Sequence, residues 1–182
     1  MNFPLLTSRV TIQPLSVEDV SDFVRYRQDP EVARYQSWDS SYSIKQGLEL
    51  VESQARMTWP DDDEWLQLAV RTLETPRLVG DLALHKLPEP NQYEIGFTLA
   101  REYQGQGYAA ESAARLIEFL FDEISAAAII ATPDSRNSRS IKLLGRLGFI
   151  ENPAKSWVEE FKGETVRVDY FELSRVRMKS RA

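Results

Sequence analysis

The stretch REYQGQGYAAE, residues 101–111, places Gly105 and Gly107 between an alternating apolar segment and the start of a helical pattern. Glycine has no Cβ and accepts positive φ, so a glycine turn lets the backbone approach a bound phosphate closely. The first N–H groups of the helix that follows lack intrahelical partners, and the helix dipole adds positive potential there. The stretch therefore predicts either a phosphate-binding loop or a plain turn.

Two common nucleotide loops fit this stretch poorly. No Gly-Lys-Ser/Thr follows at the spacing of a nucleoside triphosphate loop. Gly105, Gly107 and Ala110 match the dinucleotide pattern G-x-G-x-x-A, and Asp134 lies near the place of a ribose-binding acid. However, the five residues AREYQ separate the predicted strand from Gly105, whereas the dinucleotide pattern needs a tight strand-to-glycine turn. A nicotinamide-dependent oxidoreductase is therefore disfavoured and stays only a third possible function.

Composition narrows the class of protein further. The chain has 182 residues, of which 42% are hydrophobic and 27% charged, as in one globular domain spanning residues 1–182. The net charge of −6 argues against a protein that binds nucleic acid. No long apolar run or secretory signal is present, so we expect no membrane segment and a cytoplasmic location. With no cysteine, the chain has neither a disulfide nor a thiolate nucleophile.

Hydrophobic periodicity predicts an α/β fold with a mixed, mostly antiparallel central sheet flanked by helices. The predicted strands span residues 9–15, 65–72, 77–87, 92–99, 126–132, 149–161 and 165–173, and the last two pair across a turn at Gly163. The predicted helices span residues 16–27, 29–35, 43–57, 109–123 and 137–147. Capping residues begin the first three helices, and Gly148 ends the last.

A second stretch, RNSRSIKLLGRLGF at residues 136–149, completes a signature with the first. Residues 104–109 read Q-x-x-G-x-A, and residues 137–149 read N-x-x-S followed by a leucine-rich helix ending in Gly-Phe. Together they resemble the GNAT superfamily of acetyl-CoA-dependent N-acetyltransferases, whose pyrophosphate loop reads Q/R-x-x-G-x-G/A. The segments LLTSRVTIQPLSVEDV, DPEVARYQSW and LVGDLAL are similar to the RimJ/RimL-type branch. The resemblance covers nearly the whole chain and implies a single-domain GNAT fold.

The resemblance implies that acetyl-CoA is the acetyl donor and that no metal takes part. It places the pantetheine arm along the backbone of residues 97–99, the pyrophosphate on the amides of residues 104–110, and the start of the last helix beside the arm. The expected cofactor-binding residues are Phe97, Thr98, Leu99, Gln104, Gly105, Gln106, Gly107, Tyr108, Ala109, Ala110, Asn137 and Ser140.

Two residues are candidates for the chemistry. Since there is no cysteine, direct attack by the amine is the simplest mechanism. Glu94, on the strand beside the cofactor, is a candidate general base that acts directly or through a water; alternatively, it is a structural or acceptor-orienting carboxylate. The Ser140 hydroxyl is a candidate hydrogen-bond donor to the departing sulfur, and its competing role is helix capping together with Asn137.

Three other features of the sequence have both a functional and a structural interpretation. His85, the only histidine, is either a base or a structural side chain. The acidic run at residues 61–64 lacks the glycine and the distal glutamate of a calcium loop, so a solvated loop is favoured. The tryptophans Trp38, Trp59 and Trp65 either wall an acceptor cleft or fill the core.

The identity of the acceptor stays open. The resemblance implies a primary amine, either the N-terminal α-amine of a protein or a small molecule such as an amino acid, a polyamine or an aminoglycoside. The last strands, which help to shape the acceptor side, depart from the pattern expected of relatives that acetylate ribosomal proteins. A non-catalytic acyl-CoA-binding or regulatory module on the same fold is the alternative function. We expect a monomer or a homodimer.

Overall fold

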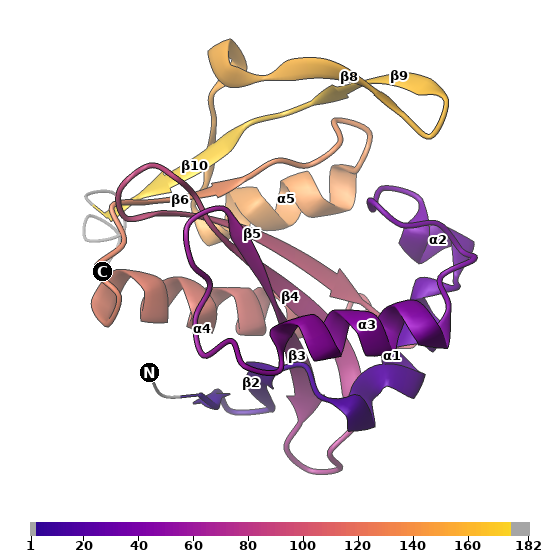
Figure 1. Cartoon of the computed structure of the whole chain (residues 1–182). Coiled ribbons are helices and arrows are strands. Elements are labelled where there is room, and N and C mark those ends of the chain that lie inside the picture. The colour runs from indigo at the N-terminus through magenta and orange to yellow at the C-terminus, as the bar shows by residue number, and fades with distance from the viewer. Residues whose placement is uncertain (1–2, 176–182) are drawn as a thin grey trace.

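A computed structural model describes residues 3–175 of the chain. Within this range, ten strands form an eight-stranded sheet in the order β1-β2-β3-β4-β5-β6-β10-β7 and a separate β8–β9 hairpin (Figure 1). Every pair is antiparallel except β5 with β6, so the predicted mixed, mostly antiparallel sheet is confirmed. Within residues 3–175, no helix is long and apolar enough to cross a membrane.

The elements follow one another along the chain, with three short 3₁₀ turns between them. The strands are β1 (Leu5–Leu6), β2 (Val10–Pro14), β3 (Glu64–Thr72), β4 (Leu78–Lys86), β5 (Gln92–Leu99), β6 (Ala128–Ala131), β7 (Ile150–Glu151), β8 (Trp157–Phe161), β9 (Glu164–Val168) and β10 (Phe171–Ser174). The helices are α1 (Val20–Arg27), α2 (Pro30–Ala33), α3 (Ile44–Gln54), α4 (Tyr108–Asp122) and α5 (Ser138–Leu147). The 3₁₀ turns are η1 (Val17–Asp19), η2 (Arg101–Tyr103) and η3 (Pro153–Lys155).

The helix starts follow the capping residues in the sequence. The Asp29 side chain accepts a hydrogen bond from the Glu31 N–H, and Pro30 occupies the first position of α2. Ser43 and Gln46 form a capping box at the start of α3. These local signals therefore set where the N-terminal helices begin, as predicted.

The main sheet lies between two layers of helices (Figure 1). Successive side chains of a strand point to opposite faces of the sheet, so one strand can contribute to the cores on both sides. Leu66 and Leu68 of β3 face the core shared with α4, in which Leu116 is fully buried. Ala69, which points the opposite way, packs with Phe23 of α1. On β5, Tyr93 and Ile95 lie in the same core as α4.

The parallel pair β5–β6 is short, and this opens the sheet. Gln92, Tyr93 and Glu94 are in register with residues 128–130, after which the two strands have no further paired residues. β6 ends at Ala131, while β5 continues to Leu99. The opening lies directly before the glycine stretch that leads into α4.

The C-terminal region corrects one prediction. The two long strands expected at residues 149–161 and 165–173 are four short ones. Pro153 has no N–H to donate to a ladder and lies in η3, which separates β7 from β8. β7 and β10 join the main sheet, whereas β8 and β9 form a hairpin that projects beyond α5 (Figure 1). The predicted turn at Gly163 is present, with a φ of 80°.

The tip of this hairpin is tied to the N-terminal half of the chain. Lys162 Nζ donates hydrogen bonds to the carbonyl oxygens of Ala33, at 2.7 Å, and Trp38, at 2.5 Å. Burial lowers the pKa of the Lys162 ammonium, and the nearby Asp39 only partly offsets this effect. Arg136 forms an ion pair with Glu164 of β9. The hairpin is thus held by polar contacts at its tip, by the buried side chains of Val166 and Val168, and by the Asp134–Val168 bridge at its base.

Candidate active site

A large cleft begins where β5 and β6 part. Its volume of 1480 Å³ exceeds the roughly 300 to 1,000 Å³ that is common for pockets binding drug-sized ligands. It is lined by the end of β5, the glycine stretch, the first turn of α4, one side of α5 and the region of α2. The cleft therefore has room for an extended ligand.

The charge of the cleft opposes the charge of the whole chain. Its lining contains one carboxylate, Glu31, and six cations, although the chain carries a net charge of −6. The cations are Arg34, Arg101, Arg136, Arg139, Lys142 and Arg146. Only Arg101 and Arg136 form ion pairs with carboxylates of residues 3–175. This concentration of positive charge favours a ligand with several negative charges.

The glycine stretch presents free amides to the cleft. Gly105 and Gly107 have φ of 75° and 87°, a region that strongly favours glycine. Within residues 3–175, the N–H groups of residues 105–110 make no backbone hydrogen bond. The Gln104 N–H differs from them, because it donates to the Arg101 carbonyl oxygen at 3.2 Å.

The Gln104 side chain instead ties the cleft together. Its Nε2 donates to the Leu99 carbonyl oxygen at 3.1 Å, and its Oε1 accepts from Arg139 Nη1 at 3.0 Å. One amide therefore links the end of β5 to α5 across the start of the glycine stretch. This link fixes the separation of the two walls.

Most of the predicted cofactor-binding residues come together in this cleft. Those that line it are Phe97, Thr98, Leu99, Gln104, Gly105, Gln106, Gly107, Ala109, Ala110, Asn137 and Ser140. Tyr108 is outside the lining, and its ring packs edge-on against Tyr103. Glu94 is also outside it. Segments 97–110 and 137–140 are thus neighbours in space, as their shared motif implies.

The start of α5 separates the roles of Asn137 and Ser140. Asn137 is the N-cap, and its Oδ1 accepts a hydrogen bond from the Ser140 backbone N–H at 3.2 Å. Ser140 is therefore the capped residue, and its hydroxyl is not the cap. Since Ser140 also lines the cleft, capping does not account for its side chain.

Glu94 lies at the vertex where β5 and β6 part. Its Oε1 accepts a hydrogen bond from Thr132 Oγ1, just beyond the end of β6. Its side chain is 18% exposed. Phe97, the first residue of β5 in the cleft lining, is three residues away, or about 10 Å along a strand. Glu94 thus lies outside the cleft lining, at the end of the pairing between β5 and β6.

His85 has partners that the sequence did not reveal. Its Nδ1 lies 3.5 Å from Glu94 Oε2, and its Nε2 lies 3.1 Å from Asp63 Oδ1. Trp65 stacks on the imidazole, with ring centroids 4.4 Å apart and an interplanar angle of 13°. His85 therefore links Glu94, which is largely buried, to Asp63 of the exposed acidic loop.

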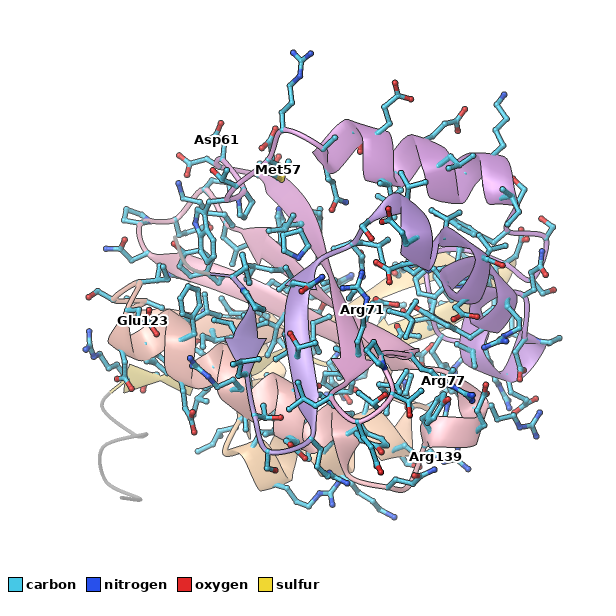
Figure 2. All side chains as sticks on the ribbon, turned by 90° about the horizontal axis from the view of Figure 1, so that it is seen from below. Met57, Asp61, Arg71, Arg77, Glu123 and Arg139 are labelled. Carbon is cyan, nitrogen blue, oxygen red and sulfur yellow. The ribbon has the colours of Figure 1, made fainter. Side chains whose placement is uncertain are left out.

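The three tryptophans and the acidic loop lie outside the cleft lining. Trp59 packs against Tyr93 and Phe119 in the core, and Trp38 stacks on the Arg27 guanidinium. Asp61 lies on the opposite side of the molecule from Arg139 of the cleft (Figure 2). Among the described residues, no cluster of three or more His, Asp or Glu side chains could hold a metal ion.

Sequence reasoning missed the cationic wall. Arg139, Lys142 and Arg146 recur at i, i+3 and i+7 and so share one face of α5, a spacing that could have indicated them. Arg34 and Tyr35 carried no such signal, because α2 reaches the cleft only through the tertiary fold.

Comparison with known proteins identifies the family. A family profile described as "Acetyltransferase (GNAT) domain" matches residues 9–150, well over half of the chain. The chain belongs to this family, and its sheet has the GNAT fold. The uncharacterized N-acetyltransferase p20 of Bacillus licheniformis is 27% identical over 170 residues, covering 93% of this chain and 94% of that protein.

Solved structures agree on the fold. A GNAT-family acetyltransferase from Bacillus anthracis superposes with a TM-score of 0.83 at 20% identity, covering 94% of this chain and 98% of that one. Spermidine N-acetyltransferase from Vibrio cholerae, in complex with CoA and spermine, has a TM-score of 0.80 at 19% identity, with 94% and 98% covered.

Proposed function

We propose that this protein transfers an acetyl group from acetyl-CoA to a primary amine. The observation that carries the proposal is the cationic cleft with the free amides of residues 105–110 at its wall. CoA has a pyrophosphate and a further phosphate, and both features match such a lining. The family and the CoA complex of the Vibrio cholerae enzyme agree with this ligand.

The chain's own residues can supply the steps of the transfer. The acceptor amine attacks the thioester carbonyl directly, because no cysteine is available to form an acyl-enzyme. Backbone groups of residues 97–99 hold the pantetheine arm and polarise the carbonyl. Glu94 takes the proton of the amine through water, and the Ser140 hydroxyl donates a hydrogen bond to the departing sulfur.

The acceptor class comes from the relatives rather than from the cleft. Spermidine N-acetyltransferase acts on a polyamine, and another relative of the same fold is named for acetylation of a ribosomal protein. Spermidine and a protein N-terminus each present a primary amine, so the proposal covers a protein N-terminus or a small amine, and the RimJ/RimL resemblance favours the first. We place the enzyme in the cytoplasm as a monomer or homodimer.

Calorimetry followed by an activity screen tests the proposal. Titration with acetyl-CoA, CoA and NAD identifies the ligand, and release of free thiol is then measured over panels of peptides, polyamines and amino acids. We expect binding of acetyl-CoA, none of NAD, and thiol release that depends on one amine class. Binding with no thiol release for any amine would support the non-catalytic module, whereas preference for NAD would overturn the proposal.

A further inference from the structure

Arg9, in the turn between β1 and β2, lies behind the glycine stretch and outside the cleft lining. Its Nη1 donates to the Gln106 carbonyl oxygen at 3.0 Å. Its Nε and Nη2 both lie 2.6 Å from Glu111 Oε2, and its guanidinium carbon lies 4.6 Å from the centroid of the Tyr108 ring. One side chain thus holds three points of the loop and of the first turn of α4.

The bond to Gln106 sets the direction of the next amide. In a trans peptide, the carbonyl of one residue and the N–H of the next point to opposite sides. Because Arg9 holds the Gln106 carbonyl from behind, the Gly107 N–H points away from Arg9. Gly107 lines the cleft and Arg9 does not, so we take the side away from Arg9 to be the side of the cleft.

We propose that Arg9 is a positioning residue for the pyrophosphate of acetyl-CoA. It fixes the Gln106–Gly107 peptide so that the Gly107 amide is presented to the phosphate oxygens before the ligand arrives. This inference rests on the proposed function, since it names the part of the ligand on which Arg9 acts. Preorganised donors bind more tightly because less ordering is needed on binding.

Glu111 holds Arg9 in this orientation. Its Oε1 accepts hydrogen bonds from Thr7 Oγ1 at 2.6 Å, Ser8 Oγ at 3.1 Å and the Arg9 N–H at 3.0 Å. Its Oε2 accepts the bond from Arg9 Nε. The carboxylate therefore anchors both the turn and the guanidinium, and it also balances the Arg9 charge. The role of Arg9 is consequently one of geometry more than of net charge.

The residue at position 107 fits this arrangement. A Cβ at Gly107 would lie 3.2 Å from Arg9 Nη2, which is a tight contact. The same position has a positive φ. The glycine thus allows both the turn and the close approach of Arg9, and the two residues form one unit although they are far apart in the sequence.

The Arg9→Met variant tests the proposal by calorimetry with CoA and with pantetheine, which lacks the pyrophosphate. We expect the Kd for CoA to rise about tenfold, as for one lost charge-assisted hydrogen bond, and the Kd for pantetheine to stay within about twofold. In the acetyl-transfer assay, KM for acetyl-CoA rises while kcat changes little. Arg9→Lys, which keeps one donor, should recover part of the affinity.

Arg115→Met is the matched control, because Arg115 lies on α4, the helix that Arg9 contacts, and pairs with Glu123, and it should leave both Kd values unchanged. A wild-type Kd for CoA in folded Arg9→Met, or an equal loss for pantetheine, would overturn the proposal. If Arg9→Met does not fold, Arg9→Lys decides: an unchanged ratio of the CoA and pantetheine Kd values contradicts it. Failure of the wild-type protein to bind CoA would instead refute the proposed function.

Discussion

Thr132 Oγ1 donates a hydrogen bond to Glu94 Oε1 at the point where β5 and β6 part, so this carboxylate links the two strands where their pairing ends. The same carboxylate is the candidate base. A structural role and a role as general base differ, because the first requires a fixed hydrogen bond and the second requires a lone pair that is free to accept a proton. Substitutions on the two sides of the bond separate these roles.

Glu94→Gln keeps the shape of the side chain but removes the carboxylate. If Glu94 is the base, kcat falls by about 100-fold or more, and the acid limb of the pH-rate profile is lost. Thr132→Val is the control, because it removes the hydrogen bond and leaves the carboxylate. We expect Thr132→Val to lower Tm while retaining most of kcat. Equal losses of kcat in the two variants, or an unchanged pH-rate profile in Glu94→Gln, would assign Glu94 a structural role.

Gly107→Val should weaken acetyl-CoA binding by about tenfold or more, because a side chain at a positive φ costs about 1 to 2 kcal/mol and displaces the loop. Gly163→Val is the matched control: Gly163 has a φ of 80°, and a Cβ there would meet no atom within 4 Å. The control shares the backbone strain but lies in the hairpin. Calorimetry with acetyl-CoA compares the two, and equal affinities would contradict the assignment of the loop.

The double variant Lys142→Gln/Arg146→Gln should weaken CoA binding by about 2- to 30-fold, since each exposed charge contributes about 0.2 to 1 kcal/mol. The loss should shrink at high salt, where exposed charges are screened. Lys45→Gln/Arg56→Gln removes the same charge outside the cleft lining and should leave the Kd unchanged. A loss that does not depend on ionic strength would argue against a charge contribution from this wall.

Glu111→Gln should reduce the free energy of unfolding by about 1 to 3 kcal/mol at pH 7. Burial acts to raise the pKa of the Glu111 carboxyl, but hydrogen bonds from Thr7, Arg9 and Ser8 outweigh it and hold the pKa below its ordinary value. A carboxyl whose pKa is lower in the folded state stabilises the protein above the unfolded pKa of about 4.3, and this contribution is lost as the pH falls through the folded pKa.

The difference between wild type and Glu111→Gln should therefore shrink between about pH 5 and pH 3. Urea unfolding at several pH values measures it. Glu123→Gln, near the other end of the same helix, should give a small difference at every pH, because the Glu123 side chain is 52% exposed. A difference for Glu111→Gln that stays constant down to pH 3 would mean that the charge of Glu111 does not contribute.

Local sequence patterns predicted much of the fold. Capping residues such as Ser43, and the alternation of the strands, predicted the starts of the helices and the antiparallel hairpins, because these features depend on neighbours a few residues apart. The split of the C-terminal strands was missed. Pro153 gave a local warning, but only the tertiary fold decides which short strand joins the main sheet and which forms the hairpin.

The part of the cleft lining that the glycine stretch forms could also be predicted from the sequence. Gln104 to Ala110 form one continuous stretch, so their joint placement follows from the sequence itself. The partners of His85 and Glu94 come from distant segments, and Arg9 meets Gln106 across nearly a hundred residues. No spacing rule connects such pairs, which is why Arg9 and the α2 wall emerge only from the folded chain.

The separate β8–β9 hairpin has an evolutionary consequence. It forms a two-stranded sheet of its own, while the loop of residues 104–110 lies between β5 of the main sheet and α4. Sequence drift in the hairpin can therefore proceed without disturbing the loop. Such a division would let one ancestral scaffold vary the hairpin while it inherits the glycine stretch unchanged.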